Sequence, residues 1–242
     1  TGTRIYTITN PLGGIIKLDT FDVFLPQLST FVGPLPLWSG VFTIAWIALT
    51  TNAANWLDGV PGQVSILTAL GAFTLGLLSL SSRVSQPEVA LIAFIVCGCA
   101  FASATFDLRG KTVLGDTGSM FFGLMLGMLS IYAGGKVATL LLAFGVPILD
   151  AFFVIAERLL KGASPFRGGN DHLHHLLINK GWRPGSVILL TVTLGAAFGI
   201  PALFLSTTQK FIALLLFTAL ILALRIFARR TPSVSRSPPT PP

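Results

Sequence analysis

All three histidines of the chain, His172, His174 and His175, lie within four residues in the segment NDHLHHLLINKGW. Imidazole can donate hydrogen bonds to phosphate, exchange protons near neutral pH, or bind zinc. Arg167 lies just upstream and Asp171 is the nearest carboxylate, whereas no cysteine accompanies the cluster. The pattern therefore favours a phosphate-binding loop, with a zinc site or a purely structural cluster as alternatives.

The motif GDTGS places Asp116 between two glycines, at the start of an apolar run. Glycine lets the backbone approach a ligand closely, and the N–H groups at a helix start favour an anion such as phosphate. An aspartate there is also a suitable ligand for Mg²⁺, which prefers oxygen and often joins carboxylates to substrate phosphates. The alternative is that Asp116 only caps the helix. Arg109 and Lys111, just upstream, either bind phosphate or follow the charge rule of membrane proteins.

A third polar motif, NAANWLDGVPG, spaces Asn52, Asn55 and Asp58 three residues apart. Residues at this spacing share one face of a helix end. Amides and a carboxylate at a membrane boundary could recognise a polar ligand. The alternative is a helix C-terminus followed by turn residues.

Composition indicates how these motifs are positioned. Of the 242 residues, 52% are hydrophobic and only 10% are charged, and the mean hydropathy is +0.80. A soluble domain carries about 25% charged residues, so the chain is expected to be an all-α polytopic membrane protein. The net charge of +7 then reflects short loops between apolar runs and argues against nucleic-acid binding. Cys97 and Cys99 are expected to be small packing residues.

We expect an external β-hairpin and loop over residues 1–34, a transmembrane domain over 35–228 and a disordered cytoplasmic tail over 229–242. Seven apolar runs are expected to form about seven membrane helices: 35–51, 63–82, 88–106, 117–133, 137–160, 186–206 and 211–228. The fifth run should kink at Pro147. It also contains Asp150. Because an acid inside an apolar run is energetically unfavourable, Asp150 is expected to be functional or to cap a broken helix near the interface.

Loop charges set the orientation. One side of the predicted bundle holds 11 Lys and Arg residues and the other holds 5, from the 16 in the chain. Because positive loops stay in the cytoplasm, the richer side is expected to be cytoplasmic. The three motif loops, 52–62, 107–119 and 161–184, all belong to that side, as a membrane-surface active site requires.

The three motifs, in this order, resemble the polyprenyl-phosphate N-acetylhexosamine-1-phosphate transferases. That family shows N-x-x-N-x-x-D-G-x-D-G, then G-D-x-G-S, then H-x-H-H, and the resemblance extends over nearly the whole chain. PILD in the fifth run, SPF before the histidines and the external hairpin fit as well. The H-x-H-H form looks more like the N-acetylglucosamine branch than the muramoyl-pentapeptide branch.

The resemblance implies transfer of a sugar-1-phosphate from a UDP-N-acetylhexosamine to polyprenyl phosphate, with release of UMP, at the bacterial cytoplasmic membrane. It implies that Asp116 binds Mg²⁺, with Mn²⁺ as the alternative ion, and that Asp58, Asn52 and Asn55 shape the nucleotide or metal site. The three histidines, with Arg167, would hold the diphosphate or sugar. Within the predicted site, Asp58, Asp116, His174 and His175 form the catalytic group, whereas Asn52, Asn55, Lys111, Gly115, Arg167 and His172 bind substrate. A homodimer is left open.

The chain also departs from the family pattern. Pro61 replaces the second aspartate of D-G-x-D-G, and Phe106 stands where an asparagine often precedes G-D-x-G-S. Family members have about ten helices and an early adjacent pair of aspartates, and this chain contains no Asp-Asp. We therefore expect a C-terminal part of such an enzyme, inactive or nearly so alone.

Three other functions would account for part of this pattern. A transporter or flippase for an anionic lipid should place ionisable groups in mid-membrane, where Asp150 is the one candidate. A CDP-alcohol phosphotransferase would need a D-x-x-D pattern, which is missing. A membrane zinc hydrolase would use the histidines and would contain zinc rather than weakly bound Mg²⁺.

Overall fold

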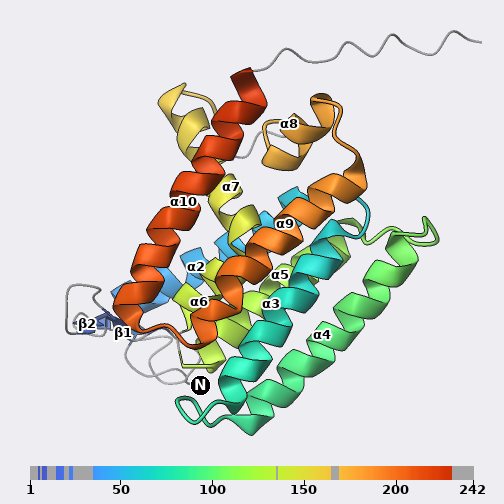
Figure 1. The fold of residues 1–242 in the computed structure, drawn as a ribbon. Coiled ribbons are helices and arrows are strands. Elements are labelled where there is room, and N and C mark those ends of the chain that lie inside the picture. Colours follow the sequence, from blue (N-terminus) through green and yellow to red (C-terminus); the bar gives the residue numbers. More distant parts are fainter. Residues whose placement is uncertain are drawn as a thin grey trace, which may run out of the picture.

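The computed structural model describes residues 5, 7–9, 15–18, 22–23, 35–134, 136–164 and 169–230. Most of these residues form helices packed side by side (Figure 1). The helices are α2 (Leu37–Leu57), α3 (Gln63–Leu80), α4 (Pro87–Asp107), α5 (Gly115–Tyr132), α6 (Val137–Ala143), α7 (Gly145–Leu160), α8 (Leu173–Asn179), α9 (Pro184–Gly199), the 3₁₀ helix η1 (Pro201–Leu203) and α10 (Thr207–Arg230).

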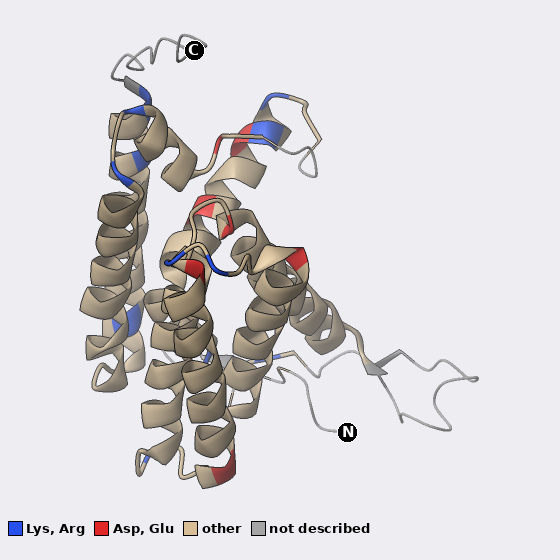
Figure 2. Cartoon of the chain, turned by 90° about the vertical axis from the view of Figure 1, so that its right-hand side faces the viewer, with Lys and Arg blue, Asp and Glu red and all other residues tan. Residues whose placement is uncertain are grey.

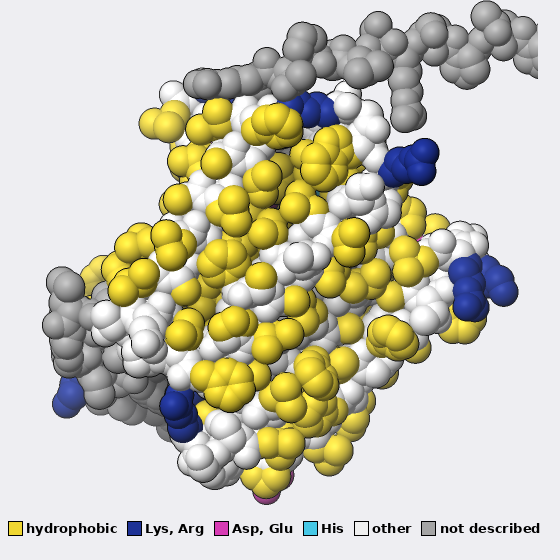
Figure 3. Space-filling view, in the orientation of Figure 1, with side chains coloured by type: hydrophobic (Ala, Val, Ile, Leu, Met, Phe, Trp, Pro, Cys, Tyr) yellow, Lys and Arg dark blue, Asp and Glu magenta, His cyan; other side chains and the backbone are white. Residues whose placement is uncertain are grey.

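Five helical segments are long and apolar enough to cross a membrane: α2, α3, α4, the segment Pro184–Leu203 and α10. The pair α6 and α7 adds a sixth if it counts as one broken span. Hydrophobic side chains cover most of the face drawn in Figure 3, and Lys, Arg, Asp and Glu are sparse along the helices (Figure 2). The expected all-α membrane architecture is therefore confirmed. The fourth apolar run, which should have supplied a seventh span, forms α5 outside this set.

Short strands precede the helices. β1 (Thr7–Thr9) pairs antiparallel with β2 (Ile15–Lys17), with Ile8 opposite Ile16 in the backbone register. The expected hairpin is therefore present. A second two-stranded sheet joins β3 (Asp22–Val23) to β4 (Leu35–Pro36), which leads directly into α2. α10 extends to Arg230, two residues into the expected tail, and residues 231–242 lie outside the described part.

α2 and α5 are antiparallel and meet along a stripe of small and polar residues. At one end, Trp46 Nε1 donates to Ser130 Oγ at 2.9 Å. In the middle, a Cβ on Gly123 would lie 2.6 Å from the carbonyl oxygen of Thr50. Small residues let membrane helices approach closely, so the C-terminal end of α2 is held against the first turn of α5.

The fifth apolar run is broken, as expected, but not at Pro147. α6 ends at Ala143 and α7 begins at Gly145, and the two axes differ by 93°. Phe144 joins them, and Pro147 lies in the first turn of α7, where a missing N–H leaves no helical hydrogen bond unmade. The break therefore precedes the proline by three residues.

The loops divide between the two ends of the bundle. At one end, Arg83 of the α3–α4 loop donates to the carbonyl oxygen of Phe204, which follows η1. At the other end lie α8 and the loops after α2, α4 and α7 (Figure 1). The three motif loops therefore come together at one end, as the sequence predicted.

Candidate active site

The first contact of the candidate site joins α2 to α5. Asn55, in the last turn of α2, donates from Nδ2 to Asp116 Oδ1 at 3.0 Å and to Ser119 Oγ at 3.2 Å. Ser119 donates in turn to the carbonyl oxygens of Gly115 and Asp116. One carboxylate oxygen of Asp116 is therefore fixed by Asn55, while the Asp116 residue remains exposed.

Asp58 follows α2 as its C-cap and belongs to the same group of polar residues. The backbone of Gly115 favours the charged form of its carboxylate. Burial raises the pKa of Asp58 above its usual value near 3.8, and the negative charges of Asp107 and Asp116 raise it further, against the opposing effect of Gly115. Three carboxylates thus repel one another in this region, and a nearby cation would offset that repulsion.

Asp107 belongs to this group, although the sequence reasoning did not single it out. It is the last residue of α4, is 5% exposed, and accepts a hydrogen bond from the backbone N–H of Gly62 at 2.6 Å. Gly62 has φ of +80° and precedes α3, so Asp107 ties the loop after α2 to α4. The sequence did contain a signal for Asp107. It is an acid at the end of an apolar run, and it begins the motif loop 107–119.

The histidine loop packs directly on the loop after α2. A Cβ on Gly59 would lie 2.5 Å from His174 Nε2 and 3.0 Å from His175 Cε1. The rings of Trp56, in the last turn of α2, and His172 have centroids 5.6 Å apart. The structure therefore brings the histidines to the Asn55–Asp58 motif, as expected from the sequence.

The three histidines differ in environment. His174 is 2% exposed, and its Nε2 has no hydrogen-bond partner among the described residues. Burial, followed by the charge of His175, lowers the pKa of His174 to about 3, with Asp150 opposing the shift. Burial and the neighbouring His172 also lower the pKa of the half-buried His175. Both rings are therefore neutral at pH 7 and can accept or donate a hydrogen bond.

His172 is held by an acid. Its Nδ1 lies 2.9 Å from Asp150 Oδ2, and Asp150 Oδ1 accepts the backbone N–H of Leu173 at 3.0 Å. A carboxylate can only accept, so His172 carries a proton on Nδ1. Asp150 is 4% exposed and is bonded to the segment that begins α8. The sequence predicted that Asp150 either functions or caps a broken helix near the interface. In the structure, Asp150 is hydrogen-bonded to the histidine loop.

Arg225 is one of the 11 cations assigned to the richer side, but it does not lie in a loop. It lies within α10 and is 1% exposed. Its Nη1 donates to Asp150 Oδ1, and its Nη2 lies 3.3 Å from Glu157 Oε2. A charge count along the sequence cannot distinguish a loop arginine from one that turns inward from a helix end.

The remaining predicted residues are less closely involved. Asn52 donates to the carbonyl oxygen of Ala48 in its own helix at 2.8 Å, so it is not joined to Asn55 by this bond. Lys111 is exposed in the loop before α5. Arg167 lies outside the described residues. Cys97 and Cys99 are free thiols, with Cys97 partly buried and Cys99 exposed.

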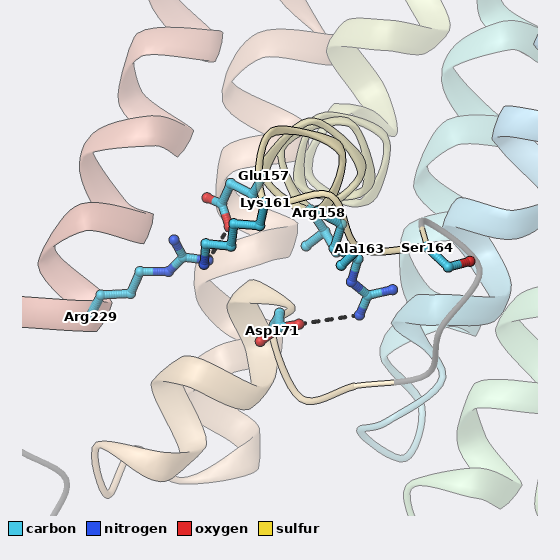
Figure 4. A pocket seen from close by; sticks show the side chains of 8 residues that line it. Glu157, Arg158, Lys161, Ala163, Ser164, Asp171 and Arg229 are labelled. Atoms are coloured by element: carbon cyan, nitrogen blue, oxygen red, sulfur yellow. Dashed lines mark hydrogen bonds and ion pairs between the residues drawn. The ribbon is translucent and has the colours of Figure 1, made fainter.

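A cavity of about 220 Å³ lies beside the histidine loop (Figure 4). Charged side chains of both signs line it, and Figure 4 shows Arg158 paired with Asp171 across it, at 3.2 Å. It is lined by Val154, Glu157, Arg158, Lys161, Ala163, Ser164, Asp171 and Arg229. Neither the three clustered carboxylates nor the histidines line this cavity, so it adjoins the candidate site without containing it.

The side chains of the candidate site suit Mg²⁺ better than a metal held by protein ligands alone. Among the described residues, no group of three His, Cys, Asp or Glu side chains is arranged to hold an ion by itself. Mg²⁺ needs less from a protein, because it is commonly held by one or two carboxylates together with substrate phosphates and water. Exposed Asp116, with Asp58 close enough to interact electrostatically, fits that mode of binding.

The fold and the site together define a class of protein: a membrane protein whose polar loops gather at one end of its helices. The sequence profile of glycosyl transferase family 4 matches residues 4–134, so the chain belongs to that family.

Three curated relatives align with most of this chain. It is 28% identical over 89% of its length to a protein of Bacillus subtilis named a probable undecaprenyl-phosphate N-acetylglucosaminyl 1-phosphate transferase. It is 27% identical over 80% of its length to the undecaprenyl-phosphate alpha-N-acetylglucosaminyl 1-phosphate transferase of Yersinia pestis, and 25% identical over 92% to that of Escherichia coli O157:H7. The chain spans 61%, 56% and 63% of these three relatives, respectively.

Proposed function

We propose that the protein containing this chain transfers N-acetylhexosamine-1-phosphate, N-acetylglucosamine-1-phosphate in the first instance, from a UDP-sugar to undecaprenyl phosphate. The observation that carries the proposal is the hydrogen bond from Asn55 to Asp116. It joins two of the three motifs that resemble this class of transferase, and the third motif packs on Gly59 of the first. The names of the three relatives support the same reaction.

In the proposed reaction, an oxygen of the lipid phosphate attacks the β-phosphorus of the UDP-sugar. The bond from that phosphorus to the oxygen bridging it to the α-phosphorus breaks, and UMP leaves with the bridging oxygen. The product is a lipid diphosphate sugar. Little covalent chemistry is left to the protein in phosphoryl transfer, so its contribution is to position the groups and balance their charge.

Asp116, held by Asn55, would bind Mg²⁺, with Mn²⁺ as the alternative, and Asp58 would complete the metal or nucleotide site. When bound, the ion would neutralise charge on the diphosphate during transfer. The raised pKa of Asp58 would also let it accept a proton from the lipid phosphate closer to neutral pH than an ordinary carboxylate.

The histidine loop would hold the other part of the donor. Burial keeps the rings of His174 and His175 uncharged. Each neutral ring still has one N–H that can donate to a phosphate or sugar oxygen. His172 carries its Nδ1 proton toward Asp150 and leaves Nε2 for a ligand. Arg167 would add positive charge to the same loop.

Two structural features argue against the alternative functions. A transporter needs an ionisable group available in mid-membrane, whereas Asp150 is paired with Arg225 and bonded to the histidine loop. A zinc hydrolase would need three converging ligands, and the described residues contain no such group. We further propose that the site faces the cytoplasm, since the loop cations favour that side.

The direct assay uses the protein expressed from the complete reading frame, in membranes or nanodiscs. UMP release and sugar incorporation into the lipid fraction are measured with UDP-N-acetylglucosamine and undecaprenyl phosphate. Both products should appear together, stop with a chelator and return with Mg²⁺ or Mn²⁺. UMP release without lipid product would indicate a hydrolase, and no release under any metal would contradict the proposal.

A further inference from the structure

Arg225 is a buried cation that no motif predicts. Among the residues that the structure describes, it is one of the largest fully buried side chains. Its guanidinium contacts three groups on two other segments: Asp150 and Glu157 of α7, and the carbonyl oxygen of Asp171, 3.2 Å away in the histidine loop. One side chain of α10 thus joins α7 to that loop.

Asp150 carries this connection onward. Its carboxylate accepts from Arg225, from His172 Nδ1 and from the backbone N–H of Leu173. Arg225 therefore reaches the histidine loop by two routes, directly at Asp171 and through Asp150 at His172. The neighbouring charges are also paired, Arg229 with Glu157 and Arg158 with Asp171.

Such a buried ion network is weak evidence for stability, because removing charges from water costs about as much as their attraction returns. A fork-shaped guanidinium does, however, fix the direction of several acceptors at once. Here every acceptor of Arg225 belongs to the histidine loop or to the helix that holds it. The network is therefore better suited to holding that loop in one orientation than to adding stability.

We propose that Arg225 is a positioning residue for the histidine loop, acting through Asp150 and the Asp171 carbonyl to hold His172 in the orientation that its ligand requires. Arg225 makes no contact with the ligand in this account. The proposal rests on the proposed function, because it assigns His172 to the donor substrate.

A double-mutant cycle between Arg225 and His172 tests the coupling. The variants Arg225→Met, His172→Ala and the double variant are made in the complete protein, and kcat and KM are measured for UMP release. We expect Arg225→Met to lower kcat/KM about 10- to 100-fold, as loss of an outer supporting partner does elsewhere. In the His172→Ala background the same change should cost less than about 3-fold, because residues in one network are not additive.

Arg229→Met is the matched control. Arg229 lies one turn along α10, is more exposed than Arg225 and pairs with Glu157 alone among the described carboxylates. Its removal should leave kcat/KM within about 3-fold of the parent, as expected for an exposed pair. Arg225→Lys should fall between Arg225→Met and the parent, because one ammonium cannot reproduce the fork of bonds.

Hydrogen exchange of the peptide covering residues 170–178 supplies a readout independent of activity. The Leu173 amide donates to Asp150, so exchange in this peptide should accelerate in Arg225→Met and stay at the parent rate in Arg229→Met. If Arg225→Met does not fold, Arg225→Lys and Asp150→Asn take its place in both measurements, with the same expected directions.

The outcomes separate the two proposals. Multiplicative losses in the cycle, or unchanged exchange of residues 170–178 on loss of Arg225, would overturn the positioning role while leaving the transferase reaction intact. Absence of UMP release in the parent protein would overturn the proposed function. In that case faster exchange in the Arg225 variants would still support the loop-holding role, and unchanged exchange would remove it.

Discussion

The Asn55 amide donates to the Asp116 carboxylate at 3.0 Å, across 61 residues of sequence. The contact depends on how α2 and α5 pack. Gly123, two turns beyond Asp116 on α5, lets the two backbones meet, so the end of α2 lies over the start of α5. A stripe of small residues between the two helices thereby places two polar residues at one end of the bundle.

Replacing Asn55 with Ala should loosen Asp116 and weaken metal binding. Loss of a side chain that orients a metal ligand commonly costs about 10- to 100-fold in activity or metal affinity. We expect lower UMP release and a higher Mg²⁺ concentration for half-maximal rate. Asn179→Ala, at the exposed end of α8, is the control. An unchanged Mg²⁺ dependence in Asn55→Ala would argue against a metal at Asp116.

Gly123→Ala should destabilise the helix pair. The added Cβ would lie 2.6 Å from the Thr50 carbonyl oxygen and 2.7 Å from Thr51 Cα. Because backbone must move, the cost is expected to be about 1–3 kcal/mol, seen as a lower Tm in detergent. Gly98→Ala is the matched control, since a Cβ there meets nothing within 4 Å. Equal Tm values for the two variants would contradict the observed packing.

Stability should fall as the pH is lowered below about 6.5. His174 has a folded pKa of about 3 against an ordinary value of 6.5, so between these values the unfolded chain binds a proton that the folded chain does not. The free energy of unfolding should therefore drop with falling pH, by up to about 1.4 kcal/mol per pH unit from this group.

The test compares Tm from pH 7 to pH 5 in the parent and in His174→Gln. Asp58 and His175 remain in both proteins, so the difference between the two slopes isolates His174. The variant should show the shallower decline. Parallel declines would mean that the pKa of His174 is the same in the folded and the unfolded chain.

Opposite ends of the bundle should face opposite sides of the membrane. In a background with Cys97 and Cys99 replaced by Ala, a cysteine at Lys111 should react with an impermeant maleimide only after cells are opened. A cysteine at Ser82, in the α3–α4 loop, should react in intact cells. Reaction of both in intact cells would contradict the proposed orientation.

The sequence predicted the helical membrane fold, the hairpin and the meeting of three loops, because hydropathy and loop motifs are local signals. It placed the break of the fifth run at Pro147, whereas the helix breaks at Phe144. A proline in the first turn of a helix is compatible with helical hydrogen bonding, so its presence marks the start of α7 rather than the bend.

Two residues of the site were identified only from the three-dimensional structure. Asp107 ends α4 and bonds to the backbone of Gly62, 45 residues away, and Arg225 is buried against Asp150, 75 residues away. Neither lies in a repeated or spaced pattern. Conversely, Asn52 shares the spacing of Asn55 and Asp58 but donates to its own helix, because spacing gives a shared face without saying which side chain finds a partner.

The most direct measurement compares Asp116→Asn with Glu88→Gln, both in the protein from the complete reading frame. Asp116 lies at the end of the bundle that holds the site, and Glu88 is an exposed acid in the first turn of α4, at the opposite end. Incorporation of sugar from UDP-N-acetylglucosamine into the lipid fraction should fall by about 100-fold or more in Asp116→Asn and stay at the parent level in Glu88→Gln. Full incorporation by Asp116→Asn would contradict the central claim that Asp116 forms part of a transferase site.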